Sequence, residues 1–369
     1  MNEPNRNANA DSLPVRAKGR GSQSAPPNRF GETHAEADLE QVELDAEYLN
    51  DLRDIRTEYF PDASKSIISE NNSPDIPFRF SINPYRGCLH GCSYCYARPT
   101  HEYLGLNAGI DFETKVFFKD DAPKRLRDWL NRPGWEGAPI ALSGVTDCYQ
   151  PIEREKLVTR RCLEVMLEAR QPVGIVTKNA LVTRDLDLLG EMAQLGLASV
   201  ALSLTTLDQS LTRVLEPRTS SPAARLRALR ELNAAGVPTH VMTAPIIPGL
   251  TDSEIPALLE AAAEAGVTSA GYQILRLPLT VKPVFLEWLH RERPGEAERI
   301  ESRIRAVREG QLTASEFGKR MSGTGEIAAQ IRQTFDVFSR KFGLAQKPQP
   351  LDSSQFRPPK SSTGQLRLF

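Results

Sequence analysis

The segment Cys88-Leu-His-Gly-Cys92-Ser-Tyr-Cys95 places three cysteines in a C-x3-C-x2-C spacing within one short stretch. Three thiolates this close in sequence can each bind one iron of a cubane 4Fe-4S cluster, which leaves the fourth iron without a protein ligand. Such an iron can bind a substrate or a cosubstrate. The triplet therefore predicts a catalytic iron-sulfur cluster with Cys88, Cys92 and Cys95 as its ligands.

Two other interpretations of the triplet are weaker. A structural zinc ion usually takes a fourth Cys or His at ligand spacing, but His90 lies inside the same tight loop and His101 is poorly spaced. Disulfides are disfavoured because the chain has five cysteines in 369 residues and shows no secretory signal.

Short runs rich in β-branched or large apolar residues recur from Phe78 onward and alternate with helical patterns. Gly196, Gly236 and Gly266 stand just after three of these patterns, where a helix C-terminal glycine belongs. Repeated β-α units imply an α/β fold with a parallel sheet and a site at the carboxyl ends of the strands. The expected strands are 78–82, 116–118, 140–143, 173–177, 199–204, 239–244 and 271–275.

The triplet and this alternation resemble the radical S-adenosylmethionine (radical SAM) superfamily. Within it, the stretches from Ser81 to Cys88 and from Tyr96 to His101 resemble the bacterial, DNA repair photolyase-like relatives of spore photoproduct lyase. The resemblance covers about residues 75 to 280. It implies a partial (β/α)6 barrel of the TIM type with a 4Fe-4S cluster and SAM as cofactors. The implied chemistry is reductive cleavage of SAM to a 5′-deoxyadenosyl radical, which abstracts a hydrogen from the substrate.

Polar residues at expected strand ends are candidates for SAM binding. Ser143, Thr146 and Asp147 stand where the superfamily often carries a motif that binds the SAM ammonium group, and they offer oxygen acceptors for that cation. The alternative is that they cap a helix. Ser203 ends a later strand in the same way.

Two cations are candidates for the SAM carboxylate. Lys178 follows an expected strand, and the lyase carries a comparable lysine there. Arg218 offers a guanidinium suited to bidentate pairing. Either residue can instead belong to a surface ion pair.

Three further residues have roles that only the resemblance implies. Tyr94 would pack near the adenine, and Tyr96 would take part in a radical relay, although both can equally be hydrophobic cover for the cluster. In the lyase a cysteine donates a hydrogen atom to the repaired thymine, but Gly144 stands at that position here. Cys148 is a candidate relocated donor, with a packed thiol as the alternative. This departure argues against the lyase reaction itself.

Composition divides the chain into four parts. We expect a mostly disordered N-terminal arm (1–74), the core barrel (75–282), a helical extension that caps the barrel (283–343) and a flexible tail (344–369). The net charge is -1, so no global basic field indicates nucleic-acid binding. The apolar runs are far shorter than a membrane span, and we expect a cytoplasmic protein.

The C-terminal peptide points to DNA independently. Gln365-Leu-Arg-Leu-Phe369 resembles the motif by which bacterial polymerases and repair proteins dock on the DNA sliding clamp. Leu366, Leu368 and Phe369 can insert into an apolar groove while Gln365 hydrogen-bonds at its rim. Alternatively, the tail folds back on its own barrel.

The sequence thus predicts a radical SAM enzyme that acts in DNA repair or nucleic-acid modification and takes electrons from a donor such as flavodoxin or ferredoxin. One alternative is an iron-sulfur protein for electron transfer or sensing that docks on the replication clamp. Another is a radical SAM enzyme that acts on a peptide or a small molecule. SAM cleavage separates the first alternative from the enzyme.

Overall fold

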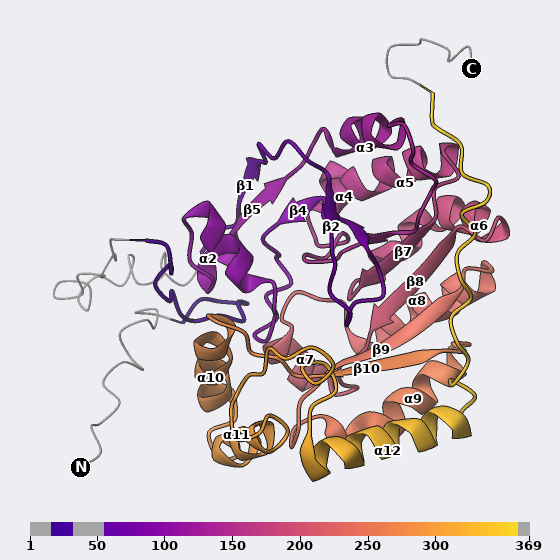
Figure 1. Cartoon of the computed structure of the whole chain (residues 1–369). Coiled ribbons are helices and arrows are strands. Elements are labelled where there is room, and N and C mark those ends of the chain that lie inside the picture. Colours follow the sequence, from indigo (N-terminus) through magenta and orange to yellow (C-terminus); the bar gives the residue numbers. More distant parts are fainter. Residues whose placement is uncertain (1–15, 32–54, 361–369) are drawn as a thin grey trace.

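The main sheet of the computed structural model, which describes residues 16–31 and 55–360, has seven strands. Its strands pair in the order β10-β9-β8-β7-β6-β3-β2, and all neighbours are parallel except β2 and β3. The six parallel strands follow one another in the chain as they do in space, and they form the predicted partial (β/α)6 barrel (Figure 1). The strands are β2 (Ile68–Glu70), β3 (Phe80–Ile82), β6 (Ile140–Leu142), β7 (Val173–Thr177), β8 (Ala198–Ser203), β9 (Thr239–Ile246) and β10 (Ala270–Ile274).

Helices between the strands cover the outside of the barrel (Figure 1). They include α3 (Ala122–Leu130), α4 (Glu153–Lys156), α5 (Val158–Glu168), α6 (Leu186–Gln194), α8 (Pro222–Ala234) and α9 (Ile255–Glu264). Helix α7 (Gln209–Leu215) instead packs through Leu211 and Leu215 in a cluster with Cys92 and Tyr94. On α5, Val158, Cys162 and Met166 are fully buried against the strands. The predicted glycines after α6, α8 and α9 adopt φ values of +70°, +76° and +86°, as helix C-terminal glycines do.

One predicted strand belongs to a different sheet. The segment 116–118 is part of β5 (Lys115–Phe118), which pairs with β1 (Glu58–Pro61) and β4 (Tyr85–Arg86) in a separate three-stranded sheet. The expectation that it lies in the barrel sheet is wrong. The chain between β3 and β6 first forms the cysteine loop, the 3-10 helix η2 (Arg98–Leu104) and helix α2 (Ile110–Thr114), so β5 returns beside that loop.

The N-terminal strap, residues 16–31, corrects the expected disordered arm. Within it, Ala17, Arg20, Ser22, Gln23 and Ser24 are buried. The strap lies against α2 and α10 (Val281–Glu292), since the Ile110 amide donates to the Ser24 carbonyl at 3.0 Å and Arg291 Nη2 donates to the Gly21 carbonyl at 3.2 Å. Hydrogen bonds rather than large apolar side chains hold this segment, which is why composition did not reveal it.

The helical extension is confirmed as α10, α11 (Ala297–Ala306) and α12 (Gly325–Lys341). Trp288 of α10 is fully buried in a cluster that also contains Cys92 and Ile300. Helix α12 packs on the outer face of α9, away from the cysteine loop (Figure 1). The extension therefore covers the cysteine-loop side of the barrel with α10 and α11 only.

The C-terminal segment is fixed as far as residue 360, which differs from the expected flexible tail. It runs along the outside of the barrel (Figure 1), where the Asp352 amide donates to the Gly196 carbonyl and the Arg357 amide to the Ala169 carbonyl, both at 2.9 Å. The clamp-like residues Gln365, Leu366, Leu368 and Phe369 lie outside the described residues, so clamp docking stays a prediction. No helix in the described ranges is long and apolar enough to cross a membrane.

Candidate functional site

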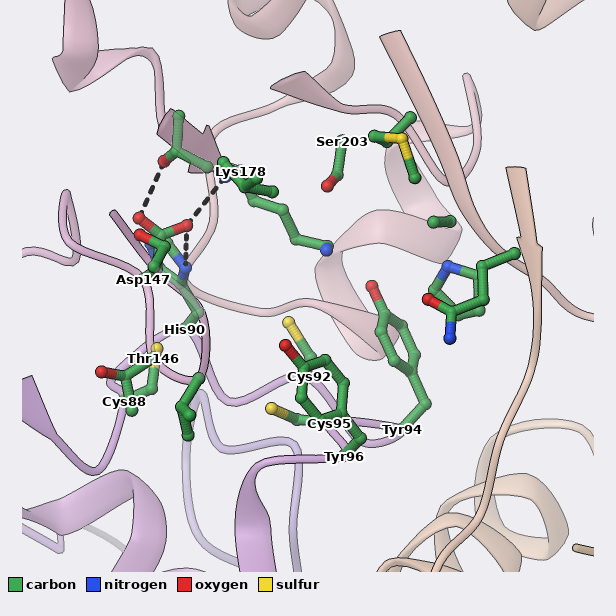
Figure 2. A pocket seen from close by; sticks show the side chains of 18 of the residues that line it. Cys88, His90, Cys92, Tyr94, Cys95, Tyr96, Thr146, Asp147, Lys178 and Ser203 are labelled. Atoms are coloured by element: carbon green, nitrogen blue, oxygen red, sulfur yellow. Dashed lines mark hydrogen bonds and ion pairs between the residues drawn. The ribbon is translucent and has the colours of Figure 1, made fainter. Parts of the chain in front are cut away.

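A cavity opens at the carboxyl ends of the barrel strands, where the sequence predicts the site. The three cysteines line it together with residues that follow β6, β7, β8 and β10 (Figure 2). Its empty volume is about 1020 Å³, including space open to solvent.

The three cysteines are free thiols, gathered at one side of this cavity (Figure 2). Burial raises the pKa of all three thiols, those of Cys88, Cys92 and Cys95. Metal binding requires the deprotonated thiolate, and a metal centre supplies the positive charge that stabilises it in such a site. The donor set therefore fits an iron-sulfur cluster.

The zinc interpretation finds no fourth ligand. The Nδ1 atom of His90 lies 3.4 Å from Asp147, and its Nε2 atom lies 3.3 Å from the Asn179 side chain. His101 is fully buried against Phe112 and Phe117. Across the part of the chain that is described, no three His, Cys, Asp or Glu side chains converge on a single-ion site.

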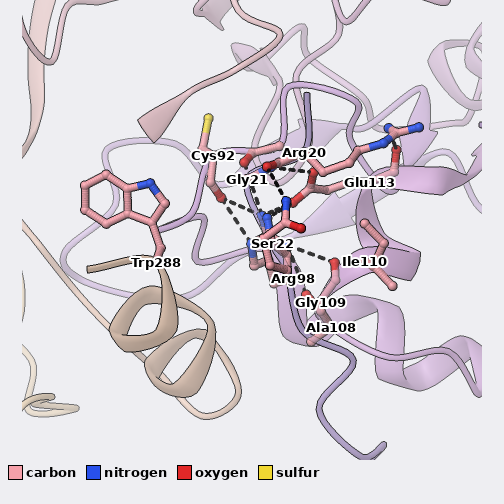
Figure 3. Close-up of polar contacts among 12 residues, drawn as sticks. Arg20, Gly21, Ser22, Cys92, Arg98, Ala108, Gly109, Ile110, Glu113 and Trp288 are labelled. Carbon is pink, nitrogen blue, oxygen red and sulfur yellow. Dashed lines mark hydrogen bonds and ion pairs between the residues drawn. The ribbon is translucent and has the colours of Figure 1, made fainter. Parts of the chain in front are cut away.

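Arg98 anchors the backbone of the cysteine loop from the buried side of the loop. Its fully buried guanidinium donates to the Cys92 carbonyl at 2.8 Å, to the Gly109 carbonyl at 2.9 Å and to the Glu113 carboxylate at 2.6 Å (Figure 3). Glu113 is also fully buried. Because removing one partner of a buried ion pair leaves the other uncompensated, this pair fixes the loop strongly.

The strap completes this anchor. The amides of Gly21 and Ser22 donate to the two oxygens of Glu113 at 3.0 Å and 2.8 Å (Figure 3). A Cβ atom on Gly21 would lie 1.8 Å from the Gly91 carbonyl oxygen, so only glycine allows the strap to approach the cysteine loop. The sequence placed Gly21 in the expected disordered arm and gave no sign of this contact.

The predicted ammonium-binding residues line the cavity, but their oxygens are already engaged. Asp147 accepts hydrogen bonds from Thr177 Oγ1 at 2.7 Å and from the amides of Tyr149 and Lys178 at 2.8 Å, in addition to its contact with His90. These contacts use both carboxylate oxygens. Asp147 therefore orders the loops after β6 and β7, and its predicted role as the ammonium acceptor is not supported.

The side chains of Ser143 and Thr146, which follow β6, also hydrogen-bond to the protein backbone. Ser143 Oγ accepts from the Cys148 amide at 2.7 Å, and Thr146 donates to the Tyr85 carbonyl at 2.7 Å. Ser143 has a φ of +71°, a left-handed conformation that is rare for a residue with a Cβ atom. The next helix, α4, begins at Glu153 with Ile152 as its N-cap, so these contacts order a turn and do not match the helix-capping alternative. Both residues line the cavity.

The two cations predicted to bind the SAM carboxylate, Lys178 and Arg218, lie in different places. Lys178 lines the cavity and its side chain reaches into it, with Nζ 5.8 Å from the centre of the Tyr94 ring (Figure 2). Within the described residues it makes no ion pair, so its ammonium group is available to an anion. Arg218 instead donates to the Gly19 carbonyl of the strap at 3.0 Å and is not among the residues that line the cavity, so its role at the SAM carboxylate stays a prediction that this geometry does not favour. Ser203 is buried and lines the cavity beside Lys178 (Figure 2).

Tyr94 belongs to a buried polar network that the sequence did not reveal. Its hydroxyl donates to Glu216, which also accepts from Thr205 at 2.8 Å and pairs with Arg225. Burial alone would raise the pKa of Glu216, but Arg225 and Lys178 lower it to about 2. The sequence signal for this network was Glu216 itself, a glutamate that follows a helix and precedes Pro217.

Tyr96 and Cys148 occupy different environments. Tyr96 is 50% exposed, lines the cavity and donates its hydroxyl to the Gly144 carbonyl at 2.9 Å. Cys148 is fully buried in the barrel core and does not line the cavity. The predicted role of Cys148 as a hydrogen donor is therefore contradicted by its position, and it is a packed core thiol.

Comparison with known proteins agrees with this geometry. The model of the radical SAM superfamily matches residues 82–262. An uncharacterised protein of Mycobacterium tuberculosis is 41% identical over 225 residues, which cover 60% of this chain and 66% of the relative. An uncharacterised protein of Methanocaldococcus jannaschii is 32% identical over 184 residues, covering 50% of this chain and 66% of the relative. The chain thus spans just under two thirds of these relatives' length.

Solved structures of spore photoproduct lyase share the fold. The lyase complexed with dinucleoside spore photoproduct superposes with a TM-score of 0.53 at 17% identity, covering 77% of this chain and 79% of the lyase. A cysteine-to-serine mutant of the lyase gives a TM-score of 0.53 at 18% identity over 77% and 78% of the two chains. At this identity the similarity concerns the fold alone.

The strap contact predicts that Gly21→Val weakens the cysteine loop. The new side chain must displace the Gly91 carbonyl, at a cost of about 1–3 kcal/mol of unfolding free energy typical of overpacking. We expect a lower thermal midpoint and a clear loss of iron bound after anaerobic reconstitution. Gly295→Val is the matched control, because nothing lies within 4 Å of a Cβ atom there. Wild-type iron content and thermal midpoint in Gly21→Val would contradict the role of the strap.

The buried network predicts a pH-dependent effect of Glu216→Gln. Loss of the charge opposite Arg225 should lower the unfolding free energy by about 3–5 kcal/mol at neutral pH. Since the pKa of Glu216 is lowered from 4.5 to about 2, its contribution is complete above pH 4.5 and is lost as the pH falls toward 2. Urea unfolding at several pH values tests this, with the partly exposed Glu231→Gln as control. An unchanged difference between pH 7 and pH 3 would be inconsistent with it.

Proposed function

Because the chain belongs to the radical SAM superfamily, we propose that it binds a 4Fe-4S cluster through Cys88, Cys92 and Cys95 and cleaves SAM reductively. We propose further that the enzyme acts on nucleic acid, in repair or modification, with a small electron-transfer protein such as flavodoxin or ferredoxin as its electron donor.

One observation carries the proposal: three free cysteines and the unpaired Lys178 line the same cavity at the mouth of the barrel. When bound and reduced, the cluster supplies one electron that cleaves SAM into methionine and a 5′-deoxyadenosyl radical, which takes a hydrogen atom from the substrate. The protein's part is to place these groups next to each other and to limit access of water.

The residues of the cavity divide this work. Lys178 binds the carboxylate of SAM as a point charge, and Ser203 offers a hydroxyl beside it. Tyr94 keeps its proton, because burial and the neighbouring Glu216 raise its pKa well above the usual value. It therefore stands in the cavity wall as a neutral ring next to the SAM site. Asp147 holds the Lys178 backbone and so positions its side chain.

The shared fold of a DNA-lesion lyase supports the nucleic-acid substrate. Spore photoproduct lyase, a protein of similar fold, has been solved in complex with dinucleoside spore photoproduct, and this supports the proposal of a nucleic-acid substrate. The lyase reaction itself is not proposed, because Gly144 replaces the donor cysteine and Cys148 is packed in the core. A different lesion or a modified base is the proposed target.

Anaerobic reconstitution followed by reduction with dithionite in the presence of SAM tests the chemistry. We expect 5′-deoxyadenosine from the wild type and its loss, by at least about 100-fold, in Cys92→Ala, since a cluster ligand is removed. Cys148→Ala is the matched control, because Cys148 does not line the cavity, and it should retain the activity.

A wild-type protein that contains a full four-iron cluster but forms no 5′-deoxyadenosine would contradict the proposal. It would favour an electron-transfer or sensing role instead. Formation of 5′-deoxyadenosine without binding of any oligonucleotide would keep the radical chemistry and favour a peptide or small-molecule substrate.

A further inference from the structure

A second cation lines the cavity and makes no ion pair with any residue that the structure describes. Arg276 follows the end of β10, and it shares the cavity wall with Gln273 and the half-exposed Tyr96. The sequence analysis did not single it out. Its position at the last strand places it among the residues that a substrate entering the barrel mouth meets.

The hydrogen-bonding capacity of Arg276 is almost unused. Its Nε atom is buried and has no hydrogen-bond partner, and Nη1 makes one weak contact of 3.7 Å with the Met321 sulfur. Within the described residues it forms no ion pair. Since buried polar groups are nearly always satisfied, such a group in a cavity wall is a position where a ligand is expected.

Its neighbours are cations that already have partners. Arg308 donates to the carbonyls of Ile274 and Leu275 at 3.2 Å and 2.7 Å. Arg320 pairs with Asp75 at 2.5 Å, and Asp75 also accepts from the Gly318 amide. Burial and then the charge of Arg320 lower the pKa of Arg276. A local excess of positive charge therefore faces the cavity, and binding of an anion would relieve it.

Other basic residues near the cysteine loop are not available in this way. Arg98 is used by the loop and by Glu113, Lys115 pairs with Asp111 at 3.0 Å, and Arg86 lies 4.0 Å from Asp62. The chain carries a net charge of -1, so it cannot attract a polyanion by a global field. An anionic substrate would need a specific contact inside the cavity.

We propose that Arg276 binds a backbone phosphate of the nucleic-acid substrate and that the Tyr96 ring beside it stacks on a base. The guanidinium fork matches two phosphate oxygens, and an exposed aromatic ring is a stacking surface for a nucleobase. The hydrogen bond from Tyr96 to Gly144 holds that ring in place. This assignment rests on the proposed function. In this assignment Lys178 binds the SAM carboxylate and Arg276 binds the substrate.

The test compares Arg276→Gln, Arg276→Lys and a matched control, Arg227→Gln, whose arginine is exposed on α8. Three quantities are measured on the reconstituted full-length protein: the Kd for SAM, the rate of 5′-deoxyadenosine formation without substrate, and the Kd for a short single-stranded DNA at several salt concentrations. Circular dichroism and the thermal midpoint establish that each variant is folded.

We expect Arg276→Gln to weaken DNA binding about tenfold, as expected for loss of a charged hydrogen bond, and to lower the salt slope by about one phosphate contact. Arg276→Lys should restore part of the affinity, because the charge remains and the fork is lost. SAM affinity and 5′-deoxyadenosine formation should be unchanged in both variants, and Arg227→Gln should behave as the wild type.

Three results would overturn the inference. Weaker SAM binding with unchanged DNA binding would assign Arg276 to the SAM carboxylate. Unchanged DNA affinity in Arg276→Gln would show that the residue does not bind phosphate, and a wild type that does not bind DNA would remove the proposed ligand. Failure of the proposed radical chemistry is separate, since it would appear as absence of 5′-deoxyadenosine in the wild type, whereas failure of the Arg276 assignment alone would appear as a wild type that binds DNA and a variant that binds it equally well.

Discussion

The buried ion pair between Arg98 and Glu113 is the interaction on which the site depends. A cysteine loop that must present its sulfurs to a cavity cannot be fixed mainly by apolar packing of those side chains. Arg98 fixes it through the backbone instead, by donating to the carbonyls of Gly91 and Cys92 from below. Glu113 balances the buried charge, and the strap amides satisfy its two oxygens. The strap thereby supports the backbone of the cysteine loop.

The charged residues that line the cavity, together with Glu216, which accepts a hydrogen bond from the cavity residue Tyr94, fall into two groups with different partners. Asp147 and Glu216 have their oxygens engaged by protein groups, and each ties several loops together. Lys178 and Arg276 line the same cavity without any carboxylate partner in the described ranges. Burying a charge is costly unless it is paired, so the engaged carboxylates explain the rigidity of the wall, and the unpaired cations mark where ligands provide the missing charge.

The sequence predicted the barrel well because its strands and helices follow from local patterns. The apolar runs of the six barrel strands, the buried face of α5 and the glycines after the helices each reflect the period of one element. The cysteine spacing likewise indicates an iron-sulfur cluster without information from distant segments. Lys178 was found because a polar residue at a strand end reaches the mouth wherever the sheet is parallel.

The remaining site residues depend on contacts between distant segments, which no local pattern shows. Glu113 and Gly21 are 92 positions apart, and their contact is visible only in the fold. Arg218 and Cys148 have suitable chemistry, yet one points to the strap and the other lies in the core. Asp147 was placed correctly at the cavity, but its hydrogen-bond partners decide its role. Sequence reasoning thus identifies which residue types reach a strand end, whereas their partners determine which of them are free to bind.

The central claim is that the three cysteines leave one iron of a four-iron cluster open to SAM. Electron-nuclear double resonance on the reduced, reconstituted protein with SAM labelled at its amino nitrogen and carboxylate oxygen measures this contact directly. Our interpretation predicts hyperfine coupling from both labels to the cluster, together with a changed electron paramagnetic resonance spectrum when SAM is added. A four-iron cluster whose spectrum does not change with SAM and that shows no coupling to either label would contradict it.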